Sequence, residues 1–114
     1  MLTIYGIPNC DSCRKARKWL DAQSVSHRFH DLRADGLDRP TLKRWLQRSD
    51  WRQLLNTRSS TWRTIADGEK KDLDAARAAA LMLKNPTLVK RPVLETKDTL
   101  EIGFSAERYR ELLT

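Results

Sequence analysis

The two cysteines of this chain, Cys10 and Cys13, are the residues best suited to do chemistry. Only two residues separate them, and they follow a short apolar run from Leu2 to Tyr5 that is typical of a buried strand. Residues 14–20 then carry helical spacing, so Cys10 is expected at a helix N-terminus. Unpaired N–H groups and the positive end of the helix dipole favour a thiolate there, and thiolates attack disulfides and oxyanions. The pattern therefore predicts sulfur redox chemistry.

The spacing also distinguishes the two thiols. If Cys10 is the N-cap residue, Cys13 stands at the third helical position, one turn along and closer to the core. We therefore predict that Cys10 is the nucleophile, with a lowered pKa, and that the less acidic Cys13 resolves a mixed disulfide. Asp11 places a negative charge beside Cys10. As the first helical residue, however, Asp11 is expected to point into solvent, where screening is strong.

Two other interpretations of the cysteines deserve comparison. Cys10 and Cys13 are followed by His27 and His30, which imitates a zinc finger. Zinc fingers place their histidines on a helix, whereas these two lie in a strand-like run and would point to opposite faces, so we expect no metal site. The second interpretation treats both cysteines as small buried hydrophobes. It is less favoured because Cys10 follows a Gly-x-Pro loop at a helix N-terminus, a position that favours reactivity.

Size and composition indicate one compact domain. The chain has 114 residues, 39% of them hydrophobic, and four tryptophans, which suffice for a core. Neither a leader-like segment nor an apolar run of membrane-spanning length is recognisable, so we expect a cytoplasmic protein with no membrane partner. A disulfide between such close cysteines would close almost no loop and would stabilise little. In a reducing compartment such a pair is usually catalytic, metal-bound or redox-sensing.

The charge balance invites a nucleic-acid interpretation that the distribution of charge does not support. Lysine and arginine number 22 against 15 acidic residues, a net charge of +7. The basic residues are scattered and interleaved with acids, apart from a short run at residues 14–18, and no nucleic-acid-binding motif accompanies them. We therefore expect no direct nucleic-acid binding. A small anionic ligand or an acidic protein surface would explain the charge equally well.

The elements that position the cysteines begin with a β-α-β unit. Residues 27–32 read as a second strand, which implies a parallel pair with a right-handed crossover. Asp38 is a plausible N-cap with Pro40 in the first turn of the next helix, and Asn85-Pro86 ends the helical region. Apolar positions in between continue the helical pattern: Leu42, Trp45, Leu46, Trp51, Leu54, Leu55, Trp62, Ile65, Leu73, Ala76, Ala80 and Leu83. The centre, at about residues 37–86, is therefore predicted to be a helical insertion.

The C-terminal part reads as a hairpin followed by a helix. Residues 93–95 and 100–104 flank a four-residue loop and predict two antiparallel strands. Ser105 is expected to cap a closing helix whose buried face includes Tyr109. The order β-α-β, helices, β-β-α predicts an α/β, thioredoxin-like fold. Residues 1–114 would form one domain around a mixed four-stranded sheet, with the helical insertion between its halves.

Three segments together resemble a known protein family. They are IPNCDSCRKAR (7–17), LNTRS (55–59) and KRPV (90–93), and they occur in this order at family-like separations. The chain resembles the arsenate reductase-like family, ArsC/Spx/YffB, from its first predicted strand to its last helix. It is most similar to the YffB branch in the runs DGL (35–37), TRSSTWR (57–63) and GFS (103–105).

The resemblance implies a set of site residues beyond the cysteines. It places the nucleophile at Cys10, anion-binding arginines at Arg58 and Arg91, and a cis-proline at Pro92 opposite the active thiol. Guanidinium groups are permanently charged and offer a rigid fork of donors that matches carboxylates and oxyanions. The Arg91-Pro92 pair also restricts Arg91 to an extended backbone. The assignment of Arg58 as an anion-binding residue depends mainly on the resemblance.

The function implied is a glutathione-dependent thiol–disulfide reductase. Cys10 would attack a disulfide, Arg58 and Arg91 would hold anionic groups of glutathione, and Cys13 or a second glutathione would resolve the intermediate. We expect a monomer that uses glutathione as co-substrate and requires no bound cofactor, metal or flavin.

The family offers two alternatives. Spx proteins have the same Cys-x2-Cys and act by binding RNA polymerase, so a disulfide between Cys10 and Cys13 could be a regulatory switch. Arsenate reductases of the family carry a further arginine where this chain has Gly103, and usually a serine where it has Cys13. Because an arsenate adduct needs its positive donors, arsenate reductase activity is the least favoured function.

Overall fold

A computed structural model describes residues 2–113 of the chain. Residue contacts divide the chain into two compact units, of which unit 1 comprises residues 1–35 and 91–114 and unit 2 comprises residues 36–90. Unit 1 holds the sheet, and unit 2 holds the central helices. That the two fold as one domain stays a prediction. Within residues 2–113, no helix is long and apolar enough to span a bilayer.

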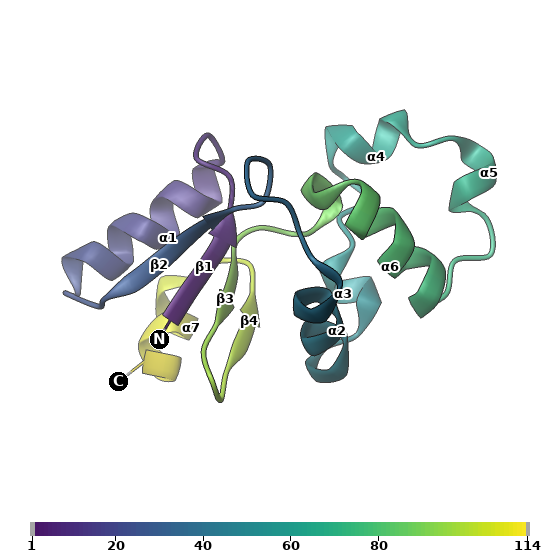
Figure 1. Cartoon of the computed structure of the whole chain (residues 1–114). Coiled ribbons are helices and arrows are strands. Elements are labelled where there is room, and N and C mark those ends of the chain that lie inside the picture. Colours follow the sequence, from purple (N-terminus) through teal and green to yellow (C-terminus); the bar gives the residue numbers. More distant parts are fainter. Residues whose placement is uncertain (1, 114) are drawn as a thin grey trace. The chain divides into compact units, whose positions relative to one another are not determined.

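The sheet of unit 1 contains four strands in the order β2-β1-β3-β4 (Figure 1). Strand β1 (Leu2–Gly6) runs parallel to β2 (His27–Asp31) and antiparallel to β3 (Val93–Glu95), which in turn pairs antiparallel with β4 (Leu100–Ile102). The parallel pair is possible because a helix connects its strands. The predicted α/β, thioredoxin-like fold with a mixed sheet is confirmed.

Two helices cover one face of this sheet (Figure 1). They are α1 (Asp11–Ala22) and α7 (Ala106–Leu113), and the Trp19 and Tyr109 rings meet edge to face between them at 5.8 Å. Alternate residues of β1 point toward these helices because side chains of a strand alternate between faces. The resulting core contains Leu2, Ile4, Ala16, Leu20, Leu94 and Tyr109.

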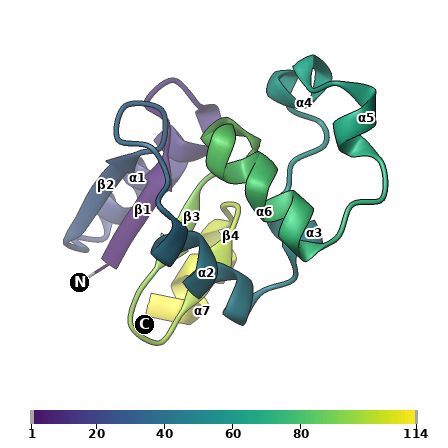
Figure 2. The ribbon, with the colours of Figure 1, turned by 45° about the vertical axis from the view of Figure 1, so that its right-hand side comes forward.

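Unit 2 consists of short helices, seen from a second side in Figure 2. The longest are α2 (Arg39–Arg48) and α6 (Ala75–Lys84), which pack against each other. As predicted, the Asp38 carboxylate accepts a 2.9 Å hydrogen bond from the Thr41 N–H at the start of α2, and α6 ends at Asn85. The remaining elements are α3 (Trp51–Leu54), α4 (Ser60–Thr64), α5 (Asp67–Lys70) and a 3-10 turn, η1 (Pro86–Leu88).

The helical region is more interrupted than its apolar spacing predicts. The side chains of Asp50, Ser59 and Asp74 each accept a hydrogen bond from a backbone N–H at the start of a helix. Each of these residues is therefore the N-cap of a new, separate helix. The buried residues of α6 are Ala78, Leu81 and Met82, whereas Ala76 and Ala80 are exposed. A helix rich in alanine and leucine has apolar residues on several sides, so packing decides which side is buried.

Candidate active site

Cys10 lies at the junction of the first loop and α1, as predicted. It is the N-cap residue of α1, with an extended backbone, and its carbonyl accepts the first helical hydrogen bond from the Arg14 N–H at 2.9 Å. The Cys10 N–H in turn donates to the Ile7 carbonyl at 3.3 Å, which closes the loop. Pro8 and Asn9 at the loop tip are exposed, and Cys10 itself is partly exposed. The residue predicted to be the nucleophile is therefore partly accessible to solvent.

The surroundings of Cys10 favour its thiolate. Partial burial opposes ionisation most strongly, but the N–H and thiol of Cys13, the positive charge of Arg91 and the N–H of Ser12 outweigh it and lower the pKa of Cys10. The Cys10 side chain makes no hydrogen bond of full capping geometry, so these groups act by orientation and charge at short range. The predicted direction of the shift agrees with the structure. Cys10 has the partial exposure and electropositive setting of a reactive cysteine.

Cys13 has the opposite environment. It is fully buried, and burial raises the pKa of its thiol to about 12, against the lowering effect of the Ile7 N–H. The neighbouring Cys10 raises it further, because two thiolates at close range repel, while Arg91 lowers it. Cys13 therefore stays protonated where Cys10 ionises. Its thiol can donate a hydrogen bond toward the Cys10 sulfur and so stabilise the Cys10 thiolate.

Asp11 does not compete with this arrangement. Its side chain is 82% exposed and forms an ion pair with Arg14 one turn later on α1. The charge of Asp11 is thus both screened by solvent and balanced by a neighbour. The expectation that Asp11 points into solvent is confirmed.

Arg91 and Pro92 precede β3 in unit 1. Their peptide bond is cis, as the family resemblance implies. Pro92 is buried, and its carbonyl accepts a 2.8 Å hydrogen bond from the Gly103 N–H just after β4. Arg91 is close enough to Cys10 and Cys13 for its charge to lower the pKa of both thiols. Unit 1 thus brings together the two cysteines and one of the two predicted arginines.

Arg58 lies in unit 2, in the turn before α4. It is exposed, and its backbone N–H donates to Oδ1 of Asn56 at 3.0 Å. In the same turn Ser59 donates from its hydroxyl to the Asn56 carbonyl at 2.9 Å and accepts from the Trp62 N–H at 3.1 Å. These contacts order the backbone on both sides of Arg58. Its role at the thiol stays a prediction.

The histidines of β2 have separate surroundings. The His27 ring contacts the Val25 carbonyl through Nδ1 at 3.0 Å, whereas the His30 ring packs against the Tyr5 ring at 4.9 Å. Across residues 2–113, no three histidine, cysteine, aspartate or glutamate side chains gather in a way that could hold a metal ion.

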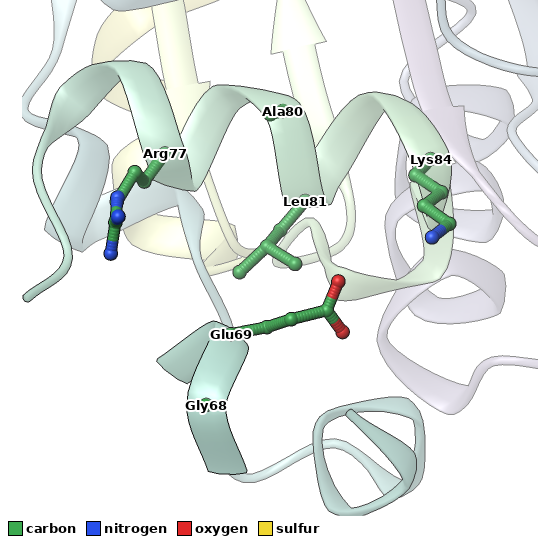
Figure 3. A pocket seen from close by; sticks show the side chains of 6 residues that line it. All are labelled: Gly68, Glu69, Arg77, Ala80, Leu81 and Lys84. Atoms are coloured by element: carbon green, nitrogen blue, oxygen red, sulfur yellow. The ribbon is translucent and has the colours of Figure 1, made fainter. Parts of the chain in front are cut away.

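Unit 2 has a hollow of its own between α5 and α6. It measures about 310 Å³, and in Figure 3 the side chains of Glu69 and Leu81 extend into the space between the two helices. The other lining residues are Gly68, Arg77, Ala80 and Lys84. None of the site residues predicted from the sequence lines this hollow.

Two residues have a relationship to Cys13 that the sequence did not predict. A side chain at Gly6 would collide with the Cys13 sulfur, whereas the sequence predicts for Gly6 only a place in the Gly-x-Pro loop before Cys10. Tyr109 is fully buried, and its pKa is raised mainly by burial and further by the neighbouring Glu101 and Cys13 groups. Neither relationship leaves a local sequence signal, because each joins residues of different elements.

Comparison with known proteins identifies the family. The ArsC family profile matches residues 5–112. The solved structure of the YFFB (PA3664) protein is 41% identical, covers 100% of both chains and superposes with a TM-score of 0.96. A solved arsenate reductase (ArsC) related protein from Brucella melitensis is 44% identical over 96% of this chain and 92% of its own, with a TM-score of 0.76.

Regulatory proteins are also among the relatives. The global transcriptional regulator Spx of Streptococcus mutans is 30% identical over 115 residues, which are 99% of this chain and 83% of the regulator. The predicted family is therefore confirmed, with YffB, Spx and arsenate reductase relatives around it. The chain belongs to the ArsC family.

Proposed function

We propose that this protein is a glutathione-dependent thiol–disulfide reductase whose nucleophile is Cys10. The observation that carries the proposal is the contrast between the two thiols. Cys10 is partly exposed and has a lowered pKa, whereas Cys13 is fully buried and has a pKa of about 12. A nucleophile must be ionised and reachable, and both requirements favour Cys10 over Cys13.

The reaction would proceed by two thiol–disulfide exchanges. The Cys10 thiolate attacks one sulfur of the substrate disulfide, forms a mixed disulfide and releases the other sulfur as a thiolate, which takes a proton from solvent. A glutathione thiolate then attacks the Cys10 sulfur or the bound substrate sulfur. The first attack releases the substrate thiolate and leaves glutathione bound to Cys10. A second glutathione thiolate then attacks the bound glutathione sulfur, which releases oxidised glutathione and the free Cys10 thiolate. The second attack frees Cys10 directly and leaves a substrate–glutathione disulfide.

Cys13 offers a second route from the same intermediate. After its proton passes to solvent, the Cys13 thiolate attacks the Cys10 sulfur, forms the Cys10–Cys13 disulfide and expels the substrate thiolate. Two glutathione molecules then reduce this disulfide and leave as oxidised glutathione. The electrons come from glutathione in either route.

Glutathione is favoured as co-substrate because it is a small anion and the site is cationic. Arg91 already supplies positive charge to the cysteines. A guanidinium binds a carboxylate through two parallel hydrogen bonds, so Arg91 and Arg58 would hold glutathione carboxylates while its thiol meets Cys10. Pro92 would border the bound thiol opposite Cys10.

The experiment is a glutathione-coupled assay with hydroxyethyl disulfide as substrate. We expect turnover by the wild type and none by Cys10→Ser. Cys13→Ser retains turnover if glutathione resolves the intermediate and loses it if Cys13 does. Urea unfolding of both variants serves as the folding control. Turnover that survives in Cys10→Ser would contradict the assignment of the nucleophile.

Arg58 requires its own test. Arg58→Gln is expected to raise the KM for glutathione by roughly tenfold to a hundredfold with little change in kcat, since a hydrogen-bonded charge contributes about 1.5–3 kcal/mol to binding. Arg63→Gln is the matched control, because Arg63 is also exposed and lies on α4, close to Arg58 in sequence. Equal KM values in the two variants would remove Arg58 from the site.

A redox switch that binds RNA polymerase is the second candidate. It is favoured by the similarity to Spx regulators and by the short range at which Cys10 and Cys13 interact. A pull-down with RNA polymerase under reducing and oxidising conditions separates the two functions. Capture that depends on oxidation, without glutathione turnover, would support the switch.

Arsenate reduction is the least supported activity. The residue at the position of the additional arginine of arsenate reductases is Gly103, whose φ of 87° lies in the left-handed region. An arginine in this conformation would be strained, so the backbone conformation at this position favours glycine. An arsenate-reduction assay of the wild type, run beside the disulfide assay, is expected to show no activity.

A further inference from the structure

Gly6 and Cys13 occupy the same small space between β1 and α1. Gly6 ends β1 on the strand face that Leu2 and Ile4 present to α1. A Cβ atom built on Gly6 would lie 2.3 Å from Sγ of Cys13 and 3.3 Å from its Cβ. The first distance is far inside van der Waals contact. The space that a side chain would fill at position 6 is therefore filled by the sulfur of Cys13.

Neither backbone is free to move aside. The Gly6 carbonyl accepts a 2.8 Å hydrogen bond from the Leu32 N–H, and Gly6 pairs with Asp31 across the parallel ladder. On the other side, α1 is held by its fully buried residues Ala16 and Leu20. Rotation about a single side-chain bond is thus the easiest way for Cys13 to escape a larger residue at position 6. Such a rotation moves the sulfur.

We propose that Gly6 is a positioning residue that holds the Cys13 sulfur within reach of Cys10. The inference rests on the roles proposed above for the two cysteines. At its present position the Cys13 thiol is near enough to Cys10 to help lower the pKa of the Cys10 thiol. Gly6 acts only through Cys13, since it offers neither a side chain nor a charge to a substrate.

The resolving step is the reaction that this placement would serve. In that step the Cys13 thiolate forms a bond to the Cys10 sulfur, and the bond from Cys10 to the substrate breaks, with the electron pair leaving on the substrate sulfur. The two protein sulfurs must be nearly in contact for this to occur. A displacement of about 1 Å from the reactive geometry can cost roughly a hundredfold in rate.

The test is a double-mutant cycle with wild type, Gly6→Ala, Cys13→Ala and the double variant. Cys10 alkylation by iodoacetamide is followed against pH in all four proteins. The closure rate of the Cys10–Cys13 disulfide, after Cys10 is loaded with glutathione, is measured where Cys13 is present. We expect Gly6→Ala to raise the pKa of Cys10 and to slow closure by roughly tenfold to a hundredfold. In the Cys13→Ala background the same substitution should leave the pKa of Cys10 unchanged.

Gly68→Ala is the matched control for adding one methyl group. A Cβ atom at Gly68 would meet nothing within 4 Å, and the control should match the wild type in both measurements. Equal shifts of the Cys10 pKa with and without Cys13 would overturn the proposal, because independent effects add. Unchanged closure in Gly6→Ala would overturn it as well.

Folding is itself informative in this cycle. If Gly6→Ala unfolds while the double variant folds, the collision with the sulfur is established and the proposal is supported. If both fail to fold, Gly6 serves the strand rather than the sulfur, and the proposal is wrong. Neither alkylation nor disulfide closure requires substrate turnover. A wild type without reductase activity would therefore refute the proposed function while leaving this inference to be judged by the cycle.

Discussion

The hydroxyl group of Tyr5 donates a 3.1 Å hydrogen bond to Oε1 of Glu95, although 90 positions separate the two residues in the chain. Strands β1 and β3 are neighbours in the sheet, and their register places Tyr5 opposite Val93, so that Glu95 is its diagonal neighbour. Both side chains are almost fully buried. The bond therefore satisfies a polar group in the interior of unit 1.

Removal of this hydroxyl should destabilise the protein. In Tyr5→Phe a buried carboxyl group loses a hydrogen-bond donor, and the desolvation cost that remains is about 1–3 kcal/mol. We expect the free energy of unfolding, measured by urea titration, to fall by this amount with an unchanged m-value. A variant as stable as the wild type would mean that Glu95 does not depend on Tyr5.

Tyr109 offers the opposite case within the same unit. Its hydroxyl is buried, and no hydrogen-bond partner for it lies among residues 2–113. Tyr109→Phe removes an unsatisfied polar atom while keeping the ring contacts with Trp19 and Phe104. We expect stability to stay equal or to rise by up to about 1–3 kcal/mol.

The comparison of these two variants is a sharper test than either alone, because the chemical change is identical. In thermal unfolding, the midpoint temperature of Tyr5→Phe should lie clearly below that of Tyr109→Phe. A loss of stability in Tyr109→Phe as large as in Tyr5→Phe would contradict the assignment of its hydroxyl as unsatisfied.

Arg91 should control the reactivity of Cys10 through its charge. In Arg91→Gln the pKa of Cys10 is expected to rise, since a positive charge that favours the thiolate is lost. The shift should be below about one pH unit, because a partly solvated charge pair contributes about 0–1 kcal/mol. The measurement is the pH dependence of iodoacetamide alkylation.

Arg28→Gln is the matched control for Arg91→Gln. Arg28 lies on β2 of the same unit, is exposed and changes the net charge equally. A Cys10 pKa that moves as much in Arg28→Gln as in Arg91→Gln would indicate an effect of overall charge rather than of proximity.

The raised pKa of Cys13 has a consequence for stability in alkali. An unfolded cysteine loses its proton near pH 8.5. Folded Cys13 keeps its proton to about pH 12. Above the unfolded value, the unfolded chain binds fewer protons than the folded one, so the free energy of unfolding falls as pH rises. Cys10 has the opposite effect, because its folded pKa is lowered. Its ionisation makes the free energy of unfolding rise with pH, and only below the pKa of an unfolded cysteine.

Urea unfolding at about pH 9 and about pH 10.5 isolates the contribution of Cys13. The loss of stability between these pH values should be greater in the wild type than in Cys13→Ala, which lacks the titrating group. Equal losses would mean that burial does not hold the Cys13 proton. Tyrosines and lysines titrate in both proteins and cancel in the comparison.

The sequence by itself determined the features that depend on neighbouring residues. An N-cap position for Cys10, the Asp38 cap with Pro40, the stop at Asn85 and the cap at Ser105 were all predictable, because capping involves atoms within a few residues. The hairpin of β3 and β4 and the parallel pair of β1 and β2 followed from short connections and their lengths. These local signals were enough to predict the fold class.

Only the tertiary structure decided the contacts between elements. The register of β1 and β3 brings Tyr5 to Glu95, and the packing of α1 on β1 seats the Cys13 sulfur against Gly6. Which side of α6 is buried was likewise settled by its neighbours, since its sequence is apolar on several sides. Such contacts depend on the geometry of whole elements, and no local pattern records them. The two cysteines could therefore be found from the sequence, but the difference in their burial and acidity required the fold.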